Sequence, residues 1–295
     1  MSSLTTEAEV ERAAREYAVF GRVSPAQKKQ LVQALQKAGR TVAMTGDGVN
    51  DLLALRQADC SIAMASGSDA ARQVSQVVLL DSDFGALPHV LAQGRRVVNN
   101  VTRVAGVFFV KTIYSALLAA ACIFLNLPFP FVPIQITLID LVIEEYPAFF
   151  TSFEPDGRKV TGRFLPTVLR RALPNALSIL VCFVLLLVIS PLFPLPAGQY
   201  AALFYLLVGT VGIQAVLKSS WPFDKLRVFL CATMTAGFYT AVFLFHHLLQ
   251  VALSSGAALG LFVLFGLLSF LVERGLALLL RPRQAPAPAK EALDG

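Results

Sequence analysis

From Val104 to about residue 280 the sequence consists of long apolar runs separated by short polar loops. A helix needs roughly 20 apolar residues to cross a bilayer core about 30 Å thick. Six runs meet this requirement, at about residues 104–125, 131–150, 173–194, 199–217, 228–250 and 257–280. At 56% hydrophobic residues the chain is too apolar for an ordinary soluble protein. These runs therefore predict an all-α bundle of six transmembrane helices.

Basic residues occur in alternate loops of this predicted bundle. Lys and Arg precede the first run, separate the second from the third and the fourth from the fifth, and follow the sixth. The other loops, NLPFPF, SPLFPLPAGQ and HHLLQVALSSG, contain neither residue. This positive-inside pattern predicts an integral, multi-pass membrane protein with both termini and the first 100 residues in the cytoplasm. The loops also account for the net charge of +6, so the expected partner is the lipid membrane and not nucleic acid.

Ionisable side chains lie inside the first two apolar runs. Lys111 lies in the first, and ITLIDLVIEEYPAFF in the second contains Asp140, Glu144 and Glu145. Such groups are costly at membrane depth and usually face an interior, a cavity or one another. Asp140 and Glu144 are four residues apart and share one helix face. Pro147 lacks a backbone donor and should kink or open the helix nearby.

Carboxylates beside a broken helix are typical of a cation site. We therefore predict that Asp140 and Glu144 act in ion transport, with Glu145 as a further candidate. The alternative is structural: Glu144 or Glu145 lies at the edge of the run, or Lys111 only neutralises a carboxylate. The residue types do not identify the ion, and calcium or another divalent cation is the expected cargo.

The first 100 residues alternate between helical and strand patterns. SPAQKKQLVQALQKAG predicts a helix with Ser24 as N-cap, Pro25 at the first position and Gly39 at the end. RTVAMTG predicts a buried strand, residues 50–58 a short helix, and CSIAMA and QVVLL two further strands. This alternation predicts a parallel α/β sheet with right-handed crossovers. Chemistry in such sheets lies at the carboxyl ends of the strands.

The motif TGDGVND, residues 45–51, follows the first of these strands. Its glycines allow a tight turn, and Asp47 and Asp51 offer the hard oxygen ligands that magnesium prefers. Lys28 in the preceding helix could neutralise a phosphoryl group as a point charge. The alternative is a polar turn with a capping aspartate. The predicted catalytic residues are Lys28, Thr45, Gly46, Asp47, Gly48, Asn50 and Asp51, with Asp47 and Asp51 as metal ligands.

Several segments resemble one known family. VFGRVSPAQKKQLV, AMTGDGVNDLLALRQADCSIAMASGSDAA, VLLDSDF and GRRVVNNV resemble the C-terminal part of the phosphorylation domain of P-type cation-transporting ATPases, in the haloacid dehalogenase superfamily. NNVTRVAGVFFVKTIYS and PFPFVPIQITLIDLVIEEYPAFFTSFEP resemble the fifth and sixth membrane helices of these pumps. The resemblance covers roughly residues 17–280. It implies a partial haloacid-dehalogenase-like, Rossmann-like cytoplasmic domain followed by the membrane bundle.

The resemblance also implies roles for individual residues. Asp47 would bind Mg²⁺ beside an aspartyl phosphate, Lys28 would contact the phosphoryl group, and ATP would be the substrate of the complete pump. Thr112 and Ser115 stand where calcium pumps have an amide and a carboxylate ligand, which weakens a calcium site. Lys111 adds a positive charge at this depth and is expected to pair with Asp140 or Glu144 in one state of the pump.

The sequence departs from the family in what it lacks. It contains no DKTGT nucleophile motif, and its only Asp-Lys pair is Asp224-Lys225. The TGE motif of the actuator domain, the nucleotide-binding domain and the first four membrane helices also have no counterpart. We therefore expect the C-terminal part of a pump, encoded as a split or truncated frame or made as a fragment, that is inactive alone. Its expected partner is a separate N-terminal pump polypeptide.

Two other interpretations stay open at this point. One is a non-catalytic membrane fragment that binds or regulates a partner pump, or a truncated product without function. The other, a phosphatase fused to a membrane anchor, is disfavoured because such enzymes also need the missing aspartate motif. For the pump interpretation we expect a bacterial cell membrane and four parts. These are the phosphorylation-domain part (1–83), a stalk helix (84–103), the transmembrane domain (104–280) and a disordered cytoplasmic tail (281–295).

Overall fold

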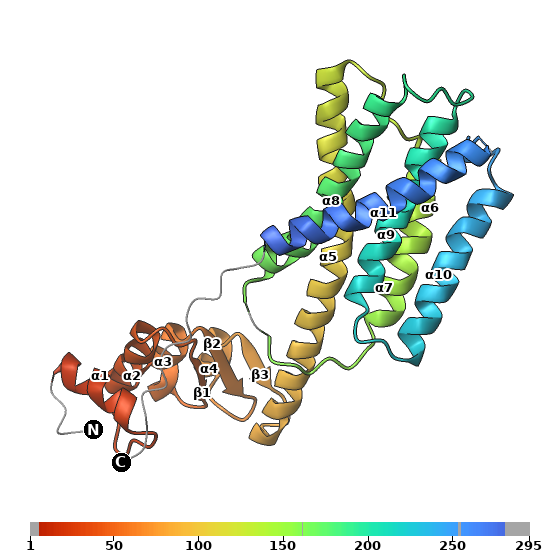
Figure 1. Cartoon of the computed structure of the whole chain (residues 1–295). Helices are drawn as coiled ribbons and strands as arrows, with labels where there is room; N and C mark the ends of the chain where they lie inside the picture. The colour runs from red at the N-terminus through yellow and green to blue at the C-terminus, as the bar shows by residue number, and fades with distance from the viewer. Residues whose placement is uncertain (1–5, 161, 253–254, 281–295) are drawn as a thin grey trace, which may run out of the picture. The chain divides into compact units, whose positions relative to one another are not determined.

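The computed structural model describes residues 6–160, 162–252 and 255–280. The chain divides into two compact units, residues 1–92 (the N-terminal unit) and residues 93–295 (the helical unit); both are drawn in Figure 1. The boundary between the units falls within one long helix, α5 (Leu87–Leu125). The tail predicted for 281–295 lies outside the described residues, and the other predicted domain boundaries stay predictions.

The N-terminal unit contains a parallel sheet with helical connections. Its three strands, β1 (Ala43–Gly46), β2 (Cys60–Met64) and β3 (Val77–Leu79), lie in the order β1-β2-β3 and pair in parallel. The helical segments are, in chain order, α1 (Glu7–Glu16), α2 (Pro25–Lys37), η1 (Val49–Asp51), α3 (Leu52–Gln57), α4 (Asp69–Val74) and η2 (Phe84–Ala86). The predicted parallel α/β class of this part is confirmed.

Local signals in the sequence account for α2 and for the core of this unit. The Ser24 hydroxyl accepts from the Gln27 N–H at 3.3 Å, and Gln27 Oε1 accepts from the Ser24 N–H at 3.1 Å, which completes a capping box. Gly39 has a φ of 77°, a left-handed conformation that glycine adopts without strain. Leu55, Ala63 and Ala71 form the small apolar core between the sheet and the helices α3 and α4.

The helical unit is a bundle whose centre is α9 (Gln199–Ser219). Beyond α5 its helices are, in chain order, α6 (Pro133–Ile139), η3 (Asp140–Glu145), α7 (Tyr146–Thr151), α8 (Phe164–Ile189), α9, α10 (Lys225–Leu244) and α11 (Gly256–Leu279). Helix α9 packs against α8, α10 and α11 and against the η3 segment. Figure 1 shows α7 and α10 side by side, and residues of the two helices are in contact.

Five helices of the described chain are long and apolar enough to cross a membrane: Phe84–Leu125, Phe164–Ile189, Gln199–Ser219, Lys225–Leu244 and Gly256–Leu279. The predicted run at 131–150 is not among them, because it forms the consecutive segments α6, η3 and α7 instead of one α-helix. The predicted order, an α/β unit followed by an apolar helical bundle, is confirmed. The count of six spans stays a prediction.

Helix α5 is continuous over 39 residues. It runs without a break from Leu87, within the predicted stalk 84–103, to the end of the predicted first span 104–125, while residues 84–86 form the separate segment η2. No proline follows Pro88 in this stretch to remove a backbone hydrogen bond.

Candidate functional site

The TGDGVND motif forms the turn at the carboxyl end of β1. Its backbone is held by the turn that follows β2: the Ser68 N–H donates to the Asp47 carbonyl oxygen at 2.7 Å. Gly67 lies so close that a Cβ built on it would meet this oxygen at 2.6 Å. The loops after β1 and β2 therefore support one another at the edge of the sheet where the sequence predicts the chemistry.

Lys28 and Asp51 form an ion pair beside this turn. Lys28 Nζ lies 2.6 Å from Asp51 Oδ1, and the Gly48 N–H lies 3.4 Å from Asp51 Oδ2. Asp51 is buried, with 7% of its surface exposed. Gly46 makes room for it, because a Cβ at position 46 would lie 2.6 Å from Asp51 Cβ. Residues that are 23 positions apart in the sequence, on α2 and η1, are thus brought together as predicted.

The Asp47 carboxylate differs from that of Asp51. Asp47 is exposed, and its carboxylate forms no hydrogen bond or ion pair with the described residues. Thr45 is half-buried in β1, and Asn50 is exposed in η1. Within the described chain no cluster of three or more His, Cys, Asp or Glu side chains could hold a metal alone.

Only one of the two predicted metal ligands, Asp47, is free to bind magnesium in this structure. Asp47 offers a free, hard oxygen ligand, and other ligands would come from phosphoryl oxygens and water, as is usual for this ion. Asp51 already binds Lys28 and the Gly48 N–H, so its carboxylate positions the lysine in this structure. Asp47 is accordingly the better candidate of the two predicted metal ligands.

In the helical unit Lys111 lies between two of the predicted carboxylates. Its Nζ is 2.7 Å from Asp140 Oδ1 and 3.7 Å from Glu144 Oε2. Glu144 is buried, with 5% of its surface exposed, and its Oε2 has no hydrogen-bond donor among the described residues. The pairing that the sequence suggested for Lys111 is therefore present with both carboxylates.

The two carboxylates lie on a π-helical segment. In η3 the Tyr146 N–H bonds to the Leu141 carbonyl five residues earlier, as in a π turn. Pro147 gives the physical reason, because it has no N–H to donate and its ring clashes with the carbonyl four residues before it. The predicted distortion of this helix is present, and single π turns are frequent at functional sites.

The other predicted transport residues lie outside this cluster. Thr112 and Glu145 are exposed, and the Thr112 hydroxyl donates at 3.4 Å to the Phe108 carbonyl of its own helix. Ser115 is half-buried. Tyr114 is a residue that the sequence analysis missed: it is 2% exposed, its hydroxyl has no partner among the described residues, and the charges of Asp140 and Glu144 act on it. Tyr114 lies three residues after Lys111, and this spacing could have placed the two side chains on the same face of the helix from the sequence alone.

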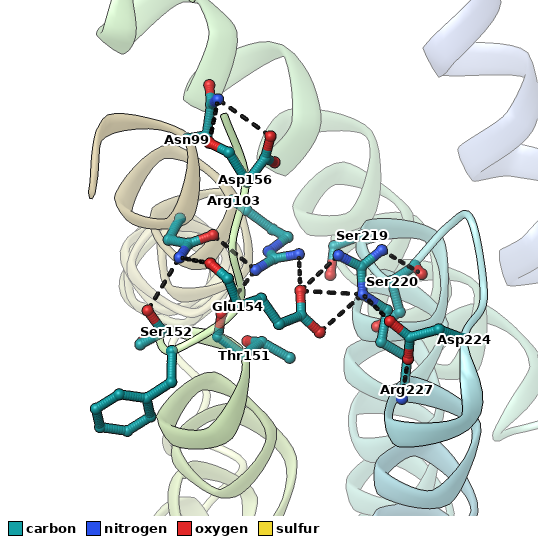
Figure 2. A network of polar contacts seen from close by, with 12 residues as sticks. Asn99, Arg103, Thr151, Ser152, Glu154, Asp156, Ser219, Ser220, Asp224 and Arg227 are labelled. Atoms are coloured by element: carbon teal, nitrogen blue, oxygen red, sulfur yellow. Dashed lines mark hydrogen bonds and ion pairs between the residues drawn. The ribbon is translucent and has the colours of Figure 1, made fainter. Parts of the chain in front are cut away.

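A second polar cluster, which we call the Glu154 network, was also missed (Figure 2). Glu154 Oε2 lies 2.7 Å from Arg103 Nη1 of α5 and 2.5 Å from Arg227 Nη2 of α10. Arg103 Nη2 also donates to the Thr151 carbonyl at 2.8 Å and to Asn100 Oδ1 at 2.9 Å. The network therefore ties α5, the end of α7 and α10 together.

The electrostatics of this region keep its carboxylates ionised. Burial alone raises the pKa of Glu154, but the hydrogen bonds from Arg227 and Arg103 outweigh it, so that the pKa lies below its usual value. A hydrogen bond from Arg158 lowers the pKa of Asp156 to about 2. From the sequence these arginines served only to predict the orientation of the helices in the membrane. Their distances from Glu154 along the chain gave no indication that they contact it.

Comparisons with known proteins agree with the resemblance noted in the sequence. Residues 5–59 match the family model of the haloacid dehalogenase-like hydrolases. The "Probable cation-transporting ATPase exp7" of Streptococcus pneumoniae serotype 4 is 47% identical over 254 residues, which cover 82% of this chain and 32% of the relative. The "Calcium-transporting ATPase CtpE" of Mycolicibacterium smegmatis is 42% identical over 74% of this chain and 29% of its own length.

Two further matches cover smaller parts of the chain. A "Calcium-transporting ATPase" of Bacillus subtilis is 38% identical over 47% of this chain and 16% of its own length. A solved structure described as "Conformational changes in the catalytic domain of the CPx-ATPase CopB- B upon nucleotide binding" is 34% identical, covering 29% of this chain and 35% of that chain, with a TM-score of 0.25. The chain thus spans about a third or less of the length of the curated relatives it matches.

Proposed function

Since the chain belongs to the P-type cation-transporting ATPases, we propose that it supplies two parts of an ATP-driven cation pump. The N-terminal unit contributes the phosphate side of the phosphorylation site, and the helical unit contributes part of the ion site. The observation that supports this most strongly is the contact of Lys111 with Asp140 and the buried Glu144, two carboxylates of one π-helical segment. The names of the relatives suggest calcium as the cargo.

In the proposed phosphate site each residue has a separate task. Lys28 carries the positive charge that attracts a phosphoryl group, and Asp51 holds this ammonium in place at 2.6 Å. Asp47 is free to hold Mg²⁺, which when bound would neutralise charge on phosphoryl oxygens. The aspartate that becomes phosphorylated would come from sequence outside these 295 residues, because they contain no DKTGT motif.

In the proposed ion site the carboxylates bind the cargo and Lys111 competes with it. Asp140 and Glu144 present oxygens at one π turn, and the Lys111 ammonium balances their charge when no cargo is bound. The continuous helix α5 carries Lys111, so movement of this helix would shift the ammonium relative to η3. Such a shift would couple events at one end of α5 to cation affinity.

A chimera tests the phosphate site. The 295 residues are joined to the remaining part of the Streptococcus pneumoniae relative, and phosphoenzyme formation and turnover are measured with ATP and Mg²⁺. We expect an acid-stable label in the chimera and none in the 295 residues alone. Asp47→Asn should slow turnover by about 10²-fold or more, because a charge that stabilises the transition state is lost.

Asp81→Asn is the matched control for this experiment, because Asp81 is exposed and has no ion pair among the described residues. It should turn over at the rate of the parent chimera. Equal rates for Asp47→Asn and Asp81→Asn would overturn the assignment of Asp47. A folded chimera without any label would overturn the proposed contribution of the N-terminal unit.

The role of Lys111 is tested in the same chimera. Lys111→Ala removes the ammonium 2.7 Å from Asp140, so added Ca²⁺ no longer competes with it. We expect the half-maximal Ca²⁺ concentration for phosphoenzyme formation to fall roughly tenfold, which corresponds to about 1.4 kcal/mol. Lys225→Ala, at an exposed lysine at the start of α10 that forms no ion pair with the described residues, is the control and should leave this concentration unchanged. An unchanged Ca²⁺ dependence in Lys111→Ala would show that Lys111 has only a structural role.

A further inference from the structure

The helical unit contains a cavity of about 630 Å³ that neither of the proposed pump sites uses. Its walls come from α5, residues 156–160 and 162–163, α8, α9, α10 and α11. It is strongly basic, with two carboxylates, Asp156 and Glu273, against eight cationic residues. These are Arg103, Arg158, Lys159, Arg163, Arg170, Arg171, Lys218 and Arg227.

The positive charge of this cavity is only partly balanced by the protein. Arg158 pairs with Asp156, and Lys218 pairs with Glu273. Arg103 and Arg227 share the carboxylate of Glu154, and Arg227 also lies 3.9 Å from Asp224. The remaining four cations form no ion pair with the described residues: Lys159, Arg163, Arg170 and Arg171. A cavity with this excess charge attracts an anion.

Two buried polar atoms in the walls also lack partners. Arg103 is 8% exposed and its Nε has no acceptor, while Asn175 is 4% exposed and its Oδ1 has no donor, among the described residues. Both atoms are closed off from the surface in this structure, so they show that polar groups lie in this wall but do not themselves contact a ligand in the cavity.

The position of Arg171 is set by the helix opposite. Gly106 of α5 leaves space for its aliphatic stem, since a Cβ built on Gly106 would lie 3.3 Å from Arg171 Cδ. The stem is therefore packed against the wall of the cavity, which limits the freedom of the guanidinium. Guanidinium groups bind phosphate oxygens in a planar, two-point geometry.

We propose that this cavity binds the headgroup of an acidic phospholipid such as phosphatidylglycerol. The phosphodiester supplies the acceptor oxygens for the unpaired cations Lys159, Arg163, Arg170 and Arg171. The rim favours a lipid over a soluble phosphate, because Trp221 and Phe164 there are 73% and 46% exposed. Aromatic side chains of this kind are typical of the membrane interface.

The cavity also lies where a lipid headgroup can reach it. Phe164 begins α8, and Ser219 ends α9, so the walls include ends of two helices long and apolar enough to cross a membrane. Basic pockets between such helices are known to suit anionic headgroups. This inference does not depend on the pump function proposed above.

Lipid titration of the purified full chain tests the proposal. The detergent-solubilised chain is titrated with short-chain phosphatidylglycerol, with phosphatidylcholine, or with inorganic phosphate, and its unfolding temperature is recorded. We expect only phosphatidylglycerol to raise it in a saturable way. Arg170→Gln combined with Arg171→Gln should weaken this binding roughly 30-fold, since each basic residue near an anionic lipid contributes about a factor of five.

Arg274→Gln is the matched control, because Arg274 is an exposed cation of α11 that does not line the cavity. It should bind phosphatidylglycerol as the parent does. If the double variant does not fold, Lys159→Gln in the connecting segment replaces it, with an expected loss of about fivefold. Saturable stabilisation by inorganic phosphate would identify a soluble phosphate as the ligand and overturn the lipid assignment. Equal binding by parent and cavity variants would overturn the site itself.

Discussion

Glu154→Gln is expected to destabilise the helical unit by about 3–5 kcal/mol, the range found when one partner of a buried ion pair is removed. The Glu154 carboxylate bridges Arg103 and Arg227, whose side chains are only 10% and 11% exposed. Glutamine keeps the shape but loses the charge, so the Arg103 guanidinium loses its ion-pair partner and Arg227 keeps only the longer contact with Asp224, at 3.9 Å. Figure 2 shows the Glu154 carboxylate between the two guanidinium groups.

The measurement is an unfolding titration in mixed detergent micelles followed by tryptophan fluorescence. Trp221 is the only tryptophan of the chain, so the signal reports on the helical unit. Arg274→Gln is the control, because Arg274 is exposed on α11 in the same unit and forms no ion pair with the described residues. Its effect should stay below about 0.5 kcal/mol. A Glu154→Gln variant as stable as this control would show that the network contributes nothing to stability.

The second large effect is expected for Gly209→Ala in α9. A Cβ at this position would lie 2.3 Å from Cζ and 2.4 Å from Cε1 of Phe238 on α10. The Phe238 ring is fully buried, and its centroid lies 6.0 Å from the centroid of the Tyr205 ring. The ring therefore has no free space into which to move. Overpacking of a tight core costs about 1–3 kcal/mol, and here the clash is with a ring at the centre of the bundle.

Gly266→Ala separates this clash from the intrinsic effect of the substitution. A Cβ at Gly266 of α11 would meet nothing within 4 Å, so only the helix propensity changes there. Alanine is favoured over glycine inside a helix by about 1 kcal/mol, and the control should therefore be neutral or stabilising. Unfolding titrations that place Gly209→Ala and Gly266→Ala at the same stability would contradict the close packing of α9 and α10.

Much of the fold followed from local patterns. The capping box at Ser24, Pro25 and the left-handed Gly39 are all short-range signals, and the structure places α2 between them. The parallel α/β class followed from the alternation of strand and helix patterns, and the apolar runs followed from length and hydropathy. The run at 131–150 was harder, because Pro147 interrupts the α-helical hydrogen bonding and the run forms three short segments.

The candidate sites were predicted less completely than the fold. The pairing of Lys111 with Asp140 or Glu144 was expected, whereas Lys28 was assigned to a phosphoryl group and Asp51 to a metal, and their ion pair with one another was not predicted. Thr112 and Glu145 were also suggested, but both are exposed, because the direction in which a helical side chain points depends on how the helix packs. Tyr114 was missed although it lies on the helix face of Lys111.

By itself the sequence determined the two-part organisation, the motif turn after β1 and the presence of charge within apolar helices, since these depend on neighbours within a few residues. Only the tertiary structure decided that Glu154 lies between Arg103 and Arg227, 51 and 73 residues away. It also decided that the basic residues of several helix ends surround one cavity. The physical reason is that hydrophobic packing sets which helices are adjacent, and charges far apart in the chain become partners only when that packing places them together.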